Sequence, residues 1–178
     1  MTPPPKNKEQ RVAVFIDVQN LYHSAKHLYQ SRVNFREILR MAVSSRKLVR
    51  TFAYVVRTKT GEERAFFDAL TAVGIETRVK DLQEYYGGLK KADWDVGLAV
   101  DAIKISDSVD AIVIVSGDGD YVPLVEYLKN HGKLVEAMAF GRSTSTKLRE
   151  AVDEFIDLES SPDKYLLKAP RWPIKIIK

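Results

Sequence analysis

Runs of apolar, mostly β-branched or aromatic residues alternate along the chain with stretches in which apolar residues recur at helical spacing. The apolar runs predict strands at residues 12–17, 48–56, 75–80, 111–115 and 134–140, and a shorter strand at 155–158. The helical spacing predicts helices at residues 20–29, 34–43, 61–73, 94–106, 121–130 and 144–151. Because strands that alternate with helices form a parallel sheet, we expect one doubly wound α/β domain, with helices on both faces of a mostly parallel central sheet.

Right-handed crossover connections limit how such a sheet can be wound. In the expected strand order 3-2-1-4-5, the strand at 12–17 lies beside the strand at 111–115. This is the topological switch point, where open α/β sheets bind ligands at the carboxyl ends of their strands.

Three segments interrupt the alternation. Residues 1–10 are rich in proline and lysine, which predicts a disordered segment before a domain at 11–159. Residues 84–91 combine a Gly-Gly turn with tyrosines and lysines, typical of a mobile loop or small hairpin. The basic tail at 160–178 contains Trp172 and three isoleucines, so it either docks on a neighbouring molecule, which would give a homodimer, or is disordered.

The amino-acid composition limits the kinds of catalytic and metal-binding site that the protein can have. The 178 residues are 45% hydrophobic, enough for one domain with a core. The absence of cysteine excludes disulfides, thiolate zinc sites and cysteine nucleophiles, and three histidines disfavour an imidazole-rich metal site. No secretory leader is evident, and no apolar run reaches the roughly 18 residues of a membrane span. We therefore expect a cytoplasmic protein without membrane attachment.

The charge is unevenly distributed. Residues 1–11 and 164–178 carry eight of the 28 basic residues but only one of the 24 acids, so residues 12–163 contain 20 bases and 23 acids. A slightly acidic core between basic ends fits an acidic metal pocket rimmed by bases, in which a bound cation reverses the local sign for an anionic substrate.

Acids follow two of the buried-type strands. Asp17 ends the first strand and is followed by Asn20, and a glycine turn after the strand at 111–115 presents Asp118 and Asp120. If these strands are neighbours, their carboxylates face one another across a crevice, which predicts a divalent-cation site.

Each acidic position also has a structural interpretation. Asp120 could cap the helix that begins at residue 121, and Asn20 could cap the first helix. Asp95 falls in the first turn of its helix, where the helix dipole favours an acid, yet that turn lies on the same rim as Asp17. Asp101, further along this helix and on another face, is expected to support the site or the fold.

Other enzyme and binding classes fit less well. A calcium-binding EF-hand loop starting at Asp118 would need Glu at its twelfth position, which is Lys129. A haloacid-dehalogenase phosphatase would use Asp118 as a nucleophile on its first strand, but Asp118 follows the fourth. A response-regulator receiver accounts for an acidic strand-end pocket but not for the loop at 84–91 or the paired acids at 118 and 120.

Three sequence motifs taken together resemble the NYN domain family of PIN-like nucleases, most closely its LabA-like branch. They are FIDVQN at 15–20, KADWDVGLAVD at 91–101 and VSGDGDYVPL at 115–124. The resemblance runs from about residue 11 to 158 and implies a PIN-like, Rossmannoid fold with a metal-dependent ribonuclease activity. The positions that match the family's acidic site are Asp17, Asn20, Asp95, Asp118 and Asp120.

The chemistry of phosphodiester cleavage agrees with this resemblance. One or two Mg²⁺ or Mn²⁺ ions can activate water and stabilise the leaving oxygen. Asp17 and Asp118 are the expected primary ligands, Asp95 and Asp120 would bind a second ion or orient water, and Asn20 would hold a water or a phosphate oxygen. The alternative is a non-catalytic module on the same fold that binds RNA or a regulatory protein.

Basic, aromatic and hydroxyl side chains near this rim are candidates for contacting a single-stranded RNA substrate. Ser116 has no evident histidine partner, so we expect it to orient the acids or a phosphate rather than act as a nucleophile. The expected substrate-binding residues are Asn20, Arg57, Tyr85, Lys90, Lys91 and Ser116.

Overall fold

The computed structural model describes residues 5–57, 64–81, 83–84, 90–91 and 94–167, with only the backbone at 83–84 and 90–91. The strands of the main sheet are β1 (Arg11–Asp17), β3 (Lys47–Arg57), β4 (Glu76–Asp81), β7 (Ala111–Val115), β8 (Leu134–Ala139) and β9 (Glu154–Asp157). The helices are α1 (Val18–Tyr29), α2 (Phe35–Val43), α3 (Arg64–Ala72), α4 (Asp95–Ser106), α5 (Val122–Asn130), α6 (Thr146–Ala151) and α7 (Pro162–Tyr165).

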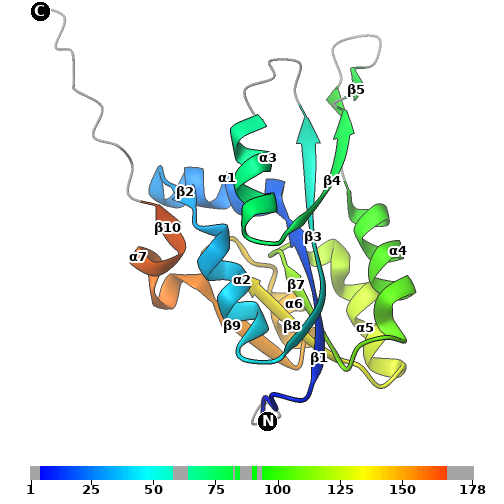
Figure 1. The fold of residues 1–178 in the computed structure, drawn as a ribbon. Helices are drawn as coiled ribbons and strands as arrows, with labels where there is room; N and C mark the ends of the chain where they lie inside the picture. Colours follow the sequence, from blue (N-terminus) through cyan, green and yellow to red (C-terminus); the bar gives the residue numbers. More distant parts are fainter. Residues whose placement is uncertain (1–4, 58–63, 82, 85–89, 92–93, 168–178) are drawn as a thin grey trace, which may run out of the picture.

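The main sheet has six strands in the order β4-β3-β1-β7-β8-β9, and every adjacent pair is parallel (Figure 1). The α/β class, the parallel sheet and the predicted order of its first five strands are confirmed. The strand order predicted from the sequence did not include the sixth strand, β9, which extends the sheet beside β8. β1 and β7 are neighbours, with Val14 opposite Val113, so the expected switch point is present.

The core lies on both faces of the sheet because the two central strands are apolar at every buried position. Along β1, Val14 and Ile16 pack on one side, against residues from α1, α2 and α3. Phe15 packs on the other side, against residues from α4, α5 and α6. Side chains that alternate along a strand point to opposite faces, so an apolar run without polar interruption predicts a strand covered by helices on both sides.

The helix ends follow local chemistry. Asn34 caps α2 by accepting a hydrogen bond from the N–H of Glu37. In α3, Leu70 is buried and Phe66 half-buried, but Ala65 is exposed. The reason is that α3 covers the edge of the sheet near β4, where fewer positions are enclosed.

Residues before and after the predicted domain also make contacts with it. In the N-terminal segment expected to be disordered, Lys6 forms ion pairs with Glu154 (2.9 Å) and Glu136 (3.4 Å). In the expected tail, Tyr165 is buried, and its carbonyl accepts a hydrogen bond from the N–H of Asn34 (2.7 Å). Ordered structure therefore reaches beyond residues 11–159, while residues 168–178, including Trp172, lie outside the described part of the chain.

Two small sheets complete the description. β10 (Leu166–Leu167) pairs antiparallel with β2 (Arg32–Val33), so the C-terminal end of the described chain is joined to the connection between α1 and α2. β5 (Gln83–Glu84) and β6 (Lys90–Lys91) also pair antiparallel, in agreement with the small-hairpin interpretation of this insertion.

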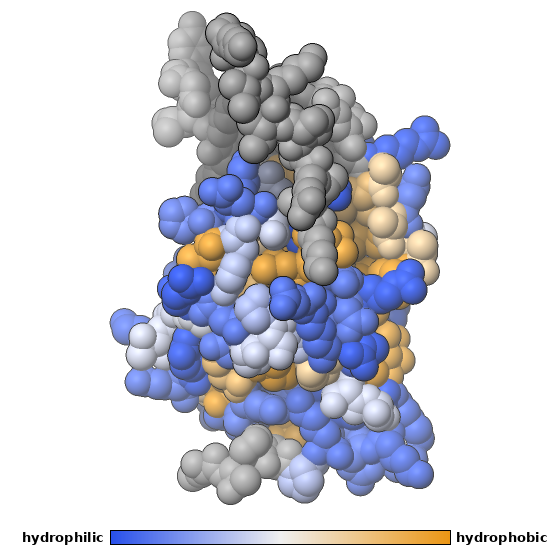
Figure 2. Space-filling view, turned by 90° about the vertical axis from the view of Figure 1, so that its left-hand side faces the viewer, coloured by the Kyte–Doolittle hydropathy of each residue, from blue (hydrophilic) through white to orange (hydrophobic). Residues whose placement is uncertain are grey.

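The side of the molecule that carries α7 and β10 is mainly hydrophilic, with apolar residues in separate patches (Figure 2). Among the described helices, none is long and apolar enough to cross a bilayer.

Candidate metal centre

The ends of β1 and β7 are tied together by short polar side chains. Asp17 is the N-cap of α1, and its Oδ1 accepts a hydrogen bond from the N–H of Asn20 (3.0 Å). The Oδ1 of Asn20 accepts a hydrogen bond from the N–H of Gly117 (2.9 Å), in the turn after β7. Asp17, not Asn20, therefore caps the first helix, and Asn20 fixes the distance between the two strand ends.

Ser116 links the acids of the two strands. Its hydroxyl donates to Oδ2 of Asp17 (3.2 Å) and accepts from the N–H of Asp118 (3.2 Å). Ser116 is fully buried. A side chain with no exposed surface does not reach a phosphate, so the structure favours the acid-orienting interpretation of this residue over the substrate-binding one.

The turn that presents the paired acids needs glycine because a loop packs directly against it. A Cβ on Gly117 would lie 2.9 Å from Oγ1 of Thr144 and 3.0 Å from the carbonyl oxygen of Ser143. A Cβ on Gly119 would lie 2.7 Å from Oγ of Ser145. The N–H of Ser145 also donates to the carbonyl of Gly117 (2.9 Å). The loop at 143–145, after β8, therefore holds the turn in position from behind.

Asp118, rather than Asp120, is the capping residue at this turn. Its Oδ1 accepts a hydrogen bond from the N–H of Asp120 (3.0 Å), which caps the short 3-10 helix η1 (Gly119–Tyr121). The capping interpretation of Asp120 is therefore wrong, because the 3-10 turn precedes α5 and moves the cap back by two residues. Asp120 is exposed at the rim.

Asp95 reaches the same rim from α4, whose start is anchored by the preceding residue. The indole N–H of Trp94 donates to the carbonyl of Val55 on β3 (2.9 Å), and its ring packs edge-on against Tyr54 at 5.4 Å. Gly97 allows this arrangement, since a Cβ there would lie 2.6 Å from the Trp94 ring. The indole thereby fixes the first turn of α4 against the sheet and with it the position of Asp95.

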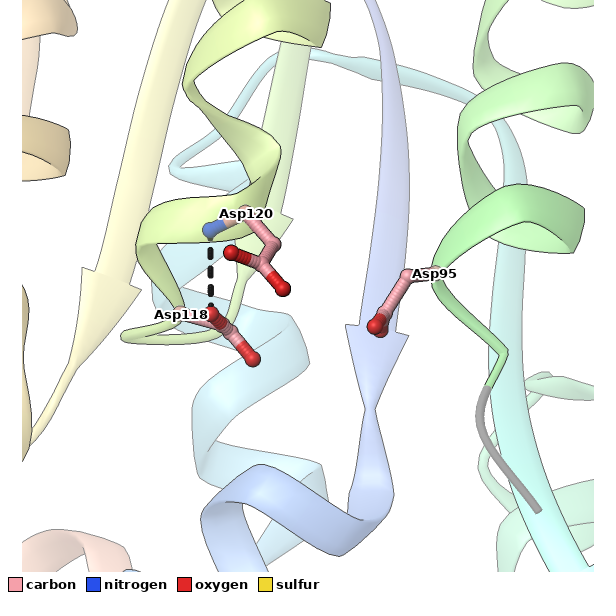
Figure 3. Close-up of side chains that lie close together, drawn as sticks. All are labelled: Asp95, Asp118 and Asp120. Atoms are coloured by element: carbon pink, nitrogen blue, oxygen red, sulfur yellow. Dashed lines mark hydrogen bonds between the residues drawn. The ribbon is translucent and has the colours of Figure 1, made fainter. Parts of the chain in front are cut away.

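Three carboxylates converge where these elements meet. One oxygen from each of Asp95, Asp118 and Asp120 lies within 4.8 Å of the other two. Figure 3 shows all three side chains directed toward the space beside the end of β1, with Asp95 facing Asp118 and Asp120. Such a set of hard oxygen donors suits Mg²⁺ or Mn²⁺, which take carboxylate ligands and retain several waters.

Asp17 has different partners from those expected of a primary ligand. It is not in the group of three, and its carboxylate accepts hydrogen bonds from Asn20 and Ser116, with the hydroxyl of Tyr121 3.4 Å away. These donors hold the side chain at the end of β1. The structure thus brings together three of the four predicted ligands and places Asp17 beside them, in contact with the groups that position them.

Tyr121 is a site residue that the sequence interpretation missed. The ring is buried, and its hydroxyl lies 3.0 Å from Oδ1 of Asp95 and 3.4 Å from Oδ2 of Asp17. Burial, and then the charges of these two acids, raise the pKa of Tyr121 well above its ordinary value, so the hydroxyl keeps its proton. The available sequence signals were its position directly after Asp120, at the start of a helix, and its place within the motif at 115–124.

The acids also influence each other's charge. Burial raises the pKa of Asp17 above its ordinary value, while hydrogen bonds from Asn20 and Ser116 oppose this shift. The negative charges of Asp95 and Asp118 raise the pKa of Asp17 further. A cation between the acids would relieve this repulsion.

The remaining predicted residues are more dispersed. Arg57 lies at the carboxyl end of β3 and pairs with Asp81 (2.8 Å). Asp101 accepts a hydrogen bond from Tyr54 (3.0 Å) and lies 3.5 Å from Arg78, so it joins α4 to the sheet. Tyr85 and the side chains of Lys90 and Lys91 lie outside the described residues.

Comparisons with known proteins agree with this architecture. A model of the NYN domain matches residues 11–159. The low amplitude and bright protein LabA of Synechococcus elongatus is 26% identical over 159 residues, which cover 85% of each chain. A crystal structure of a Vibrio parahaemolyticus protein of unknown function is 32% identical, with a TM-score of 0.82 over 92% of this chain and 100% of that one.

Proposed function

This chain belongs to the NYN domain family, and from that premise we propose that it is a divalent-metal-dependent ribonuclease that hydrolyses phosphodiester bonds in single-stranded RNA. The family is part of a nuclease superfamily, and its membership together with the acidic cluster fits a nuclease or RNA-binding role. The proposal goes further by assigning a substrate, a metal dependence and individual residues.

The convergence of Asp95, Asp118 and Asp120 carries the proposal. Three like charges within 4.8 Å of one another, contributed by α4 and by the turn after β7, are unfavourable for the fold alone. Asp118 is needed only as a cap, a task that asparagine performs as well. A cation-binding role accounts for all three carboxylates at once.

The chain's own groups have distinct tasks in this proposal. Asp95, Asp118 and Asp120 would hold one or two Mg²⁺ or Mn²⁺ ions, with Asp17 beside them. A divalent cation supplies activation of an attacking water and neutralisation of charge on the leaving oxygen. Tyr121 limits the movement of Asp95 by donating its hydrogen bond.

Two polar residues complete the proposed site. Ser116 fixes Asp17 and Asp118 relative to each other, since it contacts both. Asn20 uses its carbonyl oxygen to hold the Gly117 turn, and we propose that its amide N–H₂ faces a water or a phosphate oxygen.

A cleavage assay on single-stranded RNA tests the proposal. The purified protein is incubated with Mn²⁺ or Mg²⁺, and wild type is compared with Asp118→Asn, which keeps the cap geometry but removes the charge. A suitable control is Glu126→Gln, which removes a charge from an exposed position on α5. We expect wild-type cleavage that EDTA stops, a loss of about a hundredfold or more in Asp118→Asn, and no loss in Glu126→Gln.

Two other outcomes would contradict the proposal. Cleavage that persists in EDTA, or that Asp118→Asn leaves intact, would exclude a mechanism based on these carboxylates. RNA that is bound but never cut under any metal condition would favour the non-catalytic module.

A further inference from the structure

The outward face of α1 carries a group of polar side chains that the site does not use. His23, Lys26, His27 and Gln30 are exposed and line an open surface hollow of about 620 Å³. Their spacing of three, four and seven residues places them on one side of the helix. α1 begins directly after its cap Asp17 at the end of β1, and Asp17 and Asp95 both lie within 3.4 Å of the Tyr121 hydroxyl. The hollow therefore lies on the helix that leads away from the candidate site.

The charge of this segment is of one sign. The sequence contains no acid between Asp17 and Glu37, although residues 12–163 as a whole hold 23 acids against 20 bases. Lys26 is exposed, and within the described part of the chain it forms no ion pair with an acid. Its charge is thus available to an anionic ligand. By contrast, Arg142, which lies 5.4 Å from the centre of the Tyr29 ring at the end of α1, is already paired with Glu159 (2.7 Å).

An exposed aromatic ring accompanies these cationic and imidazole groups. Tyr22 is 47% exposed, the ammonium group of Lys26 lies 5.6 Å from the centre of its ring, and His23 packs against it edge-on at 5.5 Å. An aromatic platform beside a positive charge is what single-stranded nucleic acid binds, since bases stack on rings while phosphates contact cations. An acidic peptide would use the charge but not the ring.

We propose that single-stranded RNA held at the acidic cluster continues along this face of α1. Its phosphates contact Lys26, His23 and His27, and one base stacks on Tyr22. Lys26 is nine residues beyond Asp17, so the path is about 14 Å long at the usual rise of a helix. This inference rests on the proposed function for its substrate, but it concerns binding rather than cleavage.

The experiment measures binding of a short, fluorescently labelled, unstructured RNA by anisotropy in EDTA, where metal-dependent cleavage cannot occur. The variants are Lys26→Glu and Tyr22→Ala. The matched control is Lys104→Glu, which makes the same charge change at an exposed position toward the other end of α4. We expect binding about tenfold weaker in Lys26→Glu, with a salt dependence whose slope is shallower by about 0.7 for each phosphate that the variant no longer neutralises. Tyr22→Ala should weaken binding with an unchanged salt slope, and Lys104→Glu should match wild type.

The possible results separate this inference from the proposed function. Equal affinities of Lys26→Glu and Lys104→Glu, or no binding by wild type, would overturn the path even if Mn²⁺-dependent cleavage occurs. Selective weakening in Lys26→Glu without any cleavage would support the path while the ribonuclease proposal fails. A poly-glutamate peptide that competes as strongly as RNA would overturn the assignment to nucleic acid.

Discussion

The substitution Asp120→Asn tests whether the acidic cluster destabilises the protein when no cation is bound. The Asp120 carboxylate is exposed, and among the described residues it accepts no hydrogen bond; its backbone N–H, which donates to Asp118, is unchanged by the substitution. Asparagine keeps the shape and removes the charge. The variant therefore isolates the repulsion between Asp120 and the two acids near it.

The expected size of the effect follows from the separation. Two unit charges 4.8 Å apart repel by about 0.9 kcal/mol in water. Removing one charge of the three relieves two such pairs, and screening at physiological salt roughly halves the sum to about 1 kcal/mol. For a domain of this size, that free energy corresponds to a rise in Tm of about 2–4 °C.

Thermal unfolding in EDTA and in Mn²⁺ measures both consequences. In EDTA, we expect Asp120→Asn to melt at a higher temperature than wild type, while the control Glu126→Gln stays within about 1 °C of it. With Mn²⁺, wild type should gain stability by ligand linkage and Asp120→Asn should gain less. A lower Tm of Asp120→Asn in EDTA would refute the reasoning, because it would mean that the carboxylate stabilises the fold on its own.

Three further outcomes are expected. Tyr121→Phe removes a buried hydroxyl and should lower the free energy of unfolding by about 1–2 kcal/mol in urea titrations; an unchanged value would contradict its bridging role. Gly117→Ala should cost about 1–3 kcal/mol and more than Gly119→Ala in thermal melts, because its Cβ meets backbone atoms rather than only a serine side chain; equal costs would contradict this. Hydrogen bonds from Arg11 lower the pKa of Asp110 to about 2, so Asp110 stabilises the fold above the ordinary carboxyl pKa and loses this effect as pH falls. The stability difference between wild type and Asp110→Asn should be constant near neutral pH and shrink between about pH 4 and pH 2; a difference that persists at pH 2 would contradict the sign.

The sequence predicted the sheet well because its central strands carry a strong pattern. β1 and β7 are apolar at every enclosed position, so their burial on both faces could be inferred without a structure. The two-residue strands β2 and β10 were missed because so short a segment has no periodicity. Their pairing depends on where α7 brings the chain back, with Tyr165 entering the core.

The site was predictable in its location but not in its internal contacts. Because ligands bind at the carboxyl ends of parallel strands, Asp17 and Asp118 could be predicted to lie at the same edge of the sheet. Which carboxylate caps a helix depends on whether the chain first makes a 3-10 turn, and that geometry moved the cap from Asp120 to Asp118. The role of Tyr121 required knowing how closely α4 approaches β1, because a hydroxyl has no partner until another element supplies one.

The packing of the loop at 143–145 against the glycine turn bears on how this site can be transferred or varied. The turn that presents Asp118 is held by the loop that follows the neighbouring strand β8. Ser143, Thr144 and Ser145 of this loop fill the space that a Cβ on Gly117 or Gly119 would need. Grafting residues 115–124 alone onto another parallel sheet would transfer Asp118 and Asp120 without the loop that holds their turn in position. Conversely, a library that diversifies only residues 143–145 could retune the geometry of the centre while leaving every carboxylate in place.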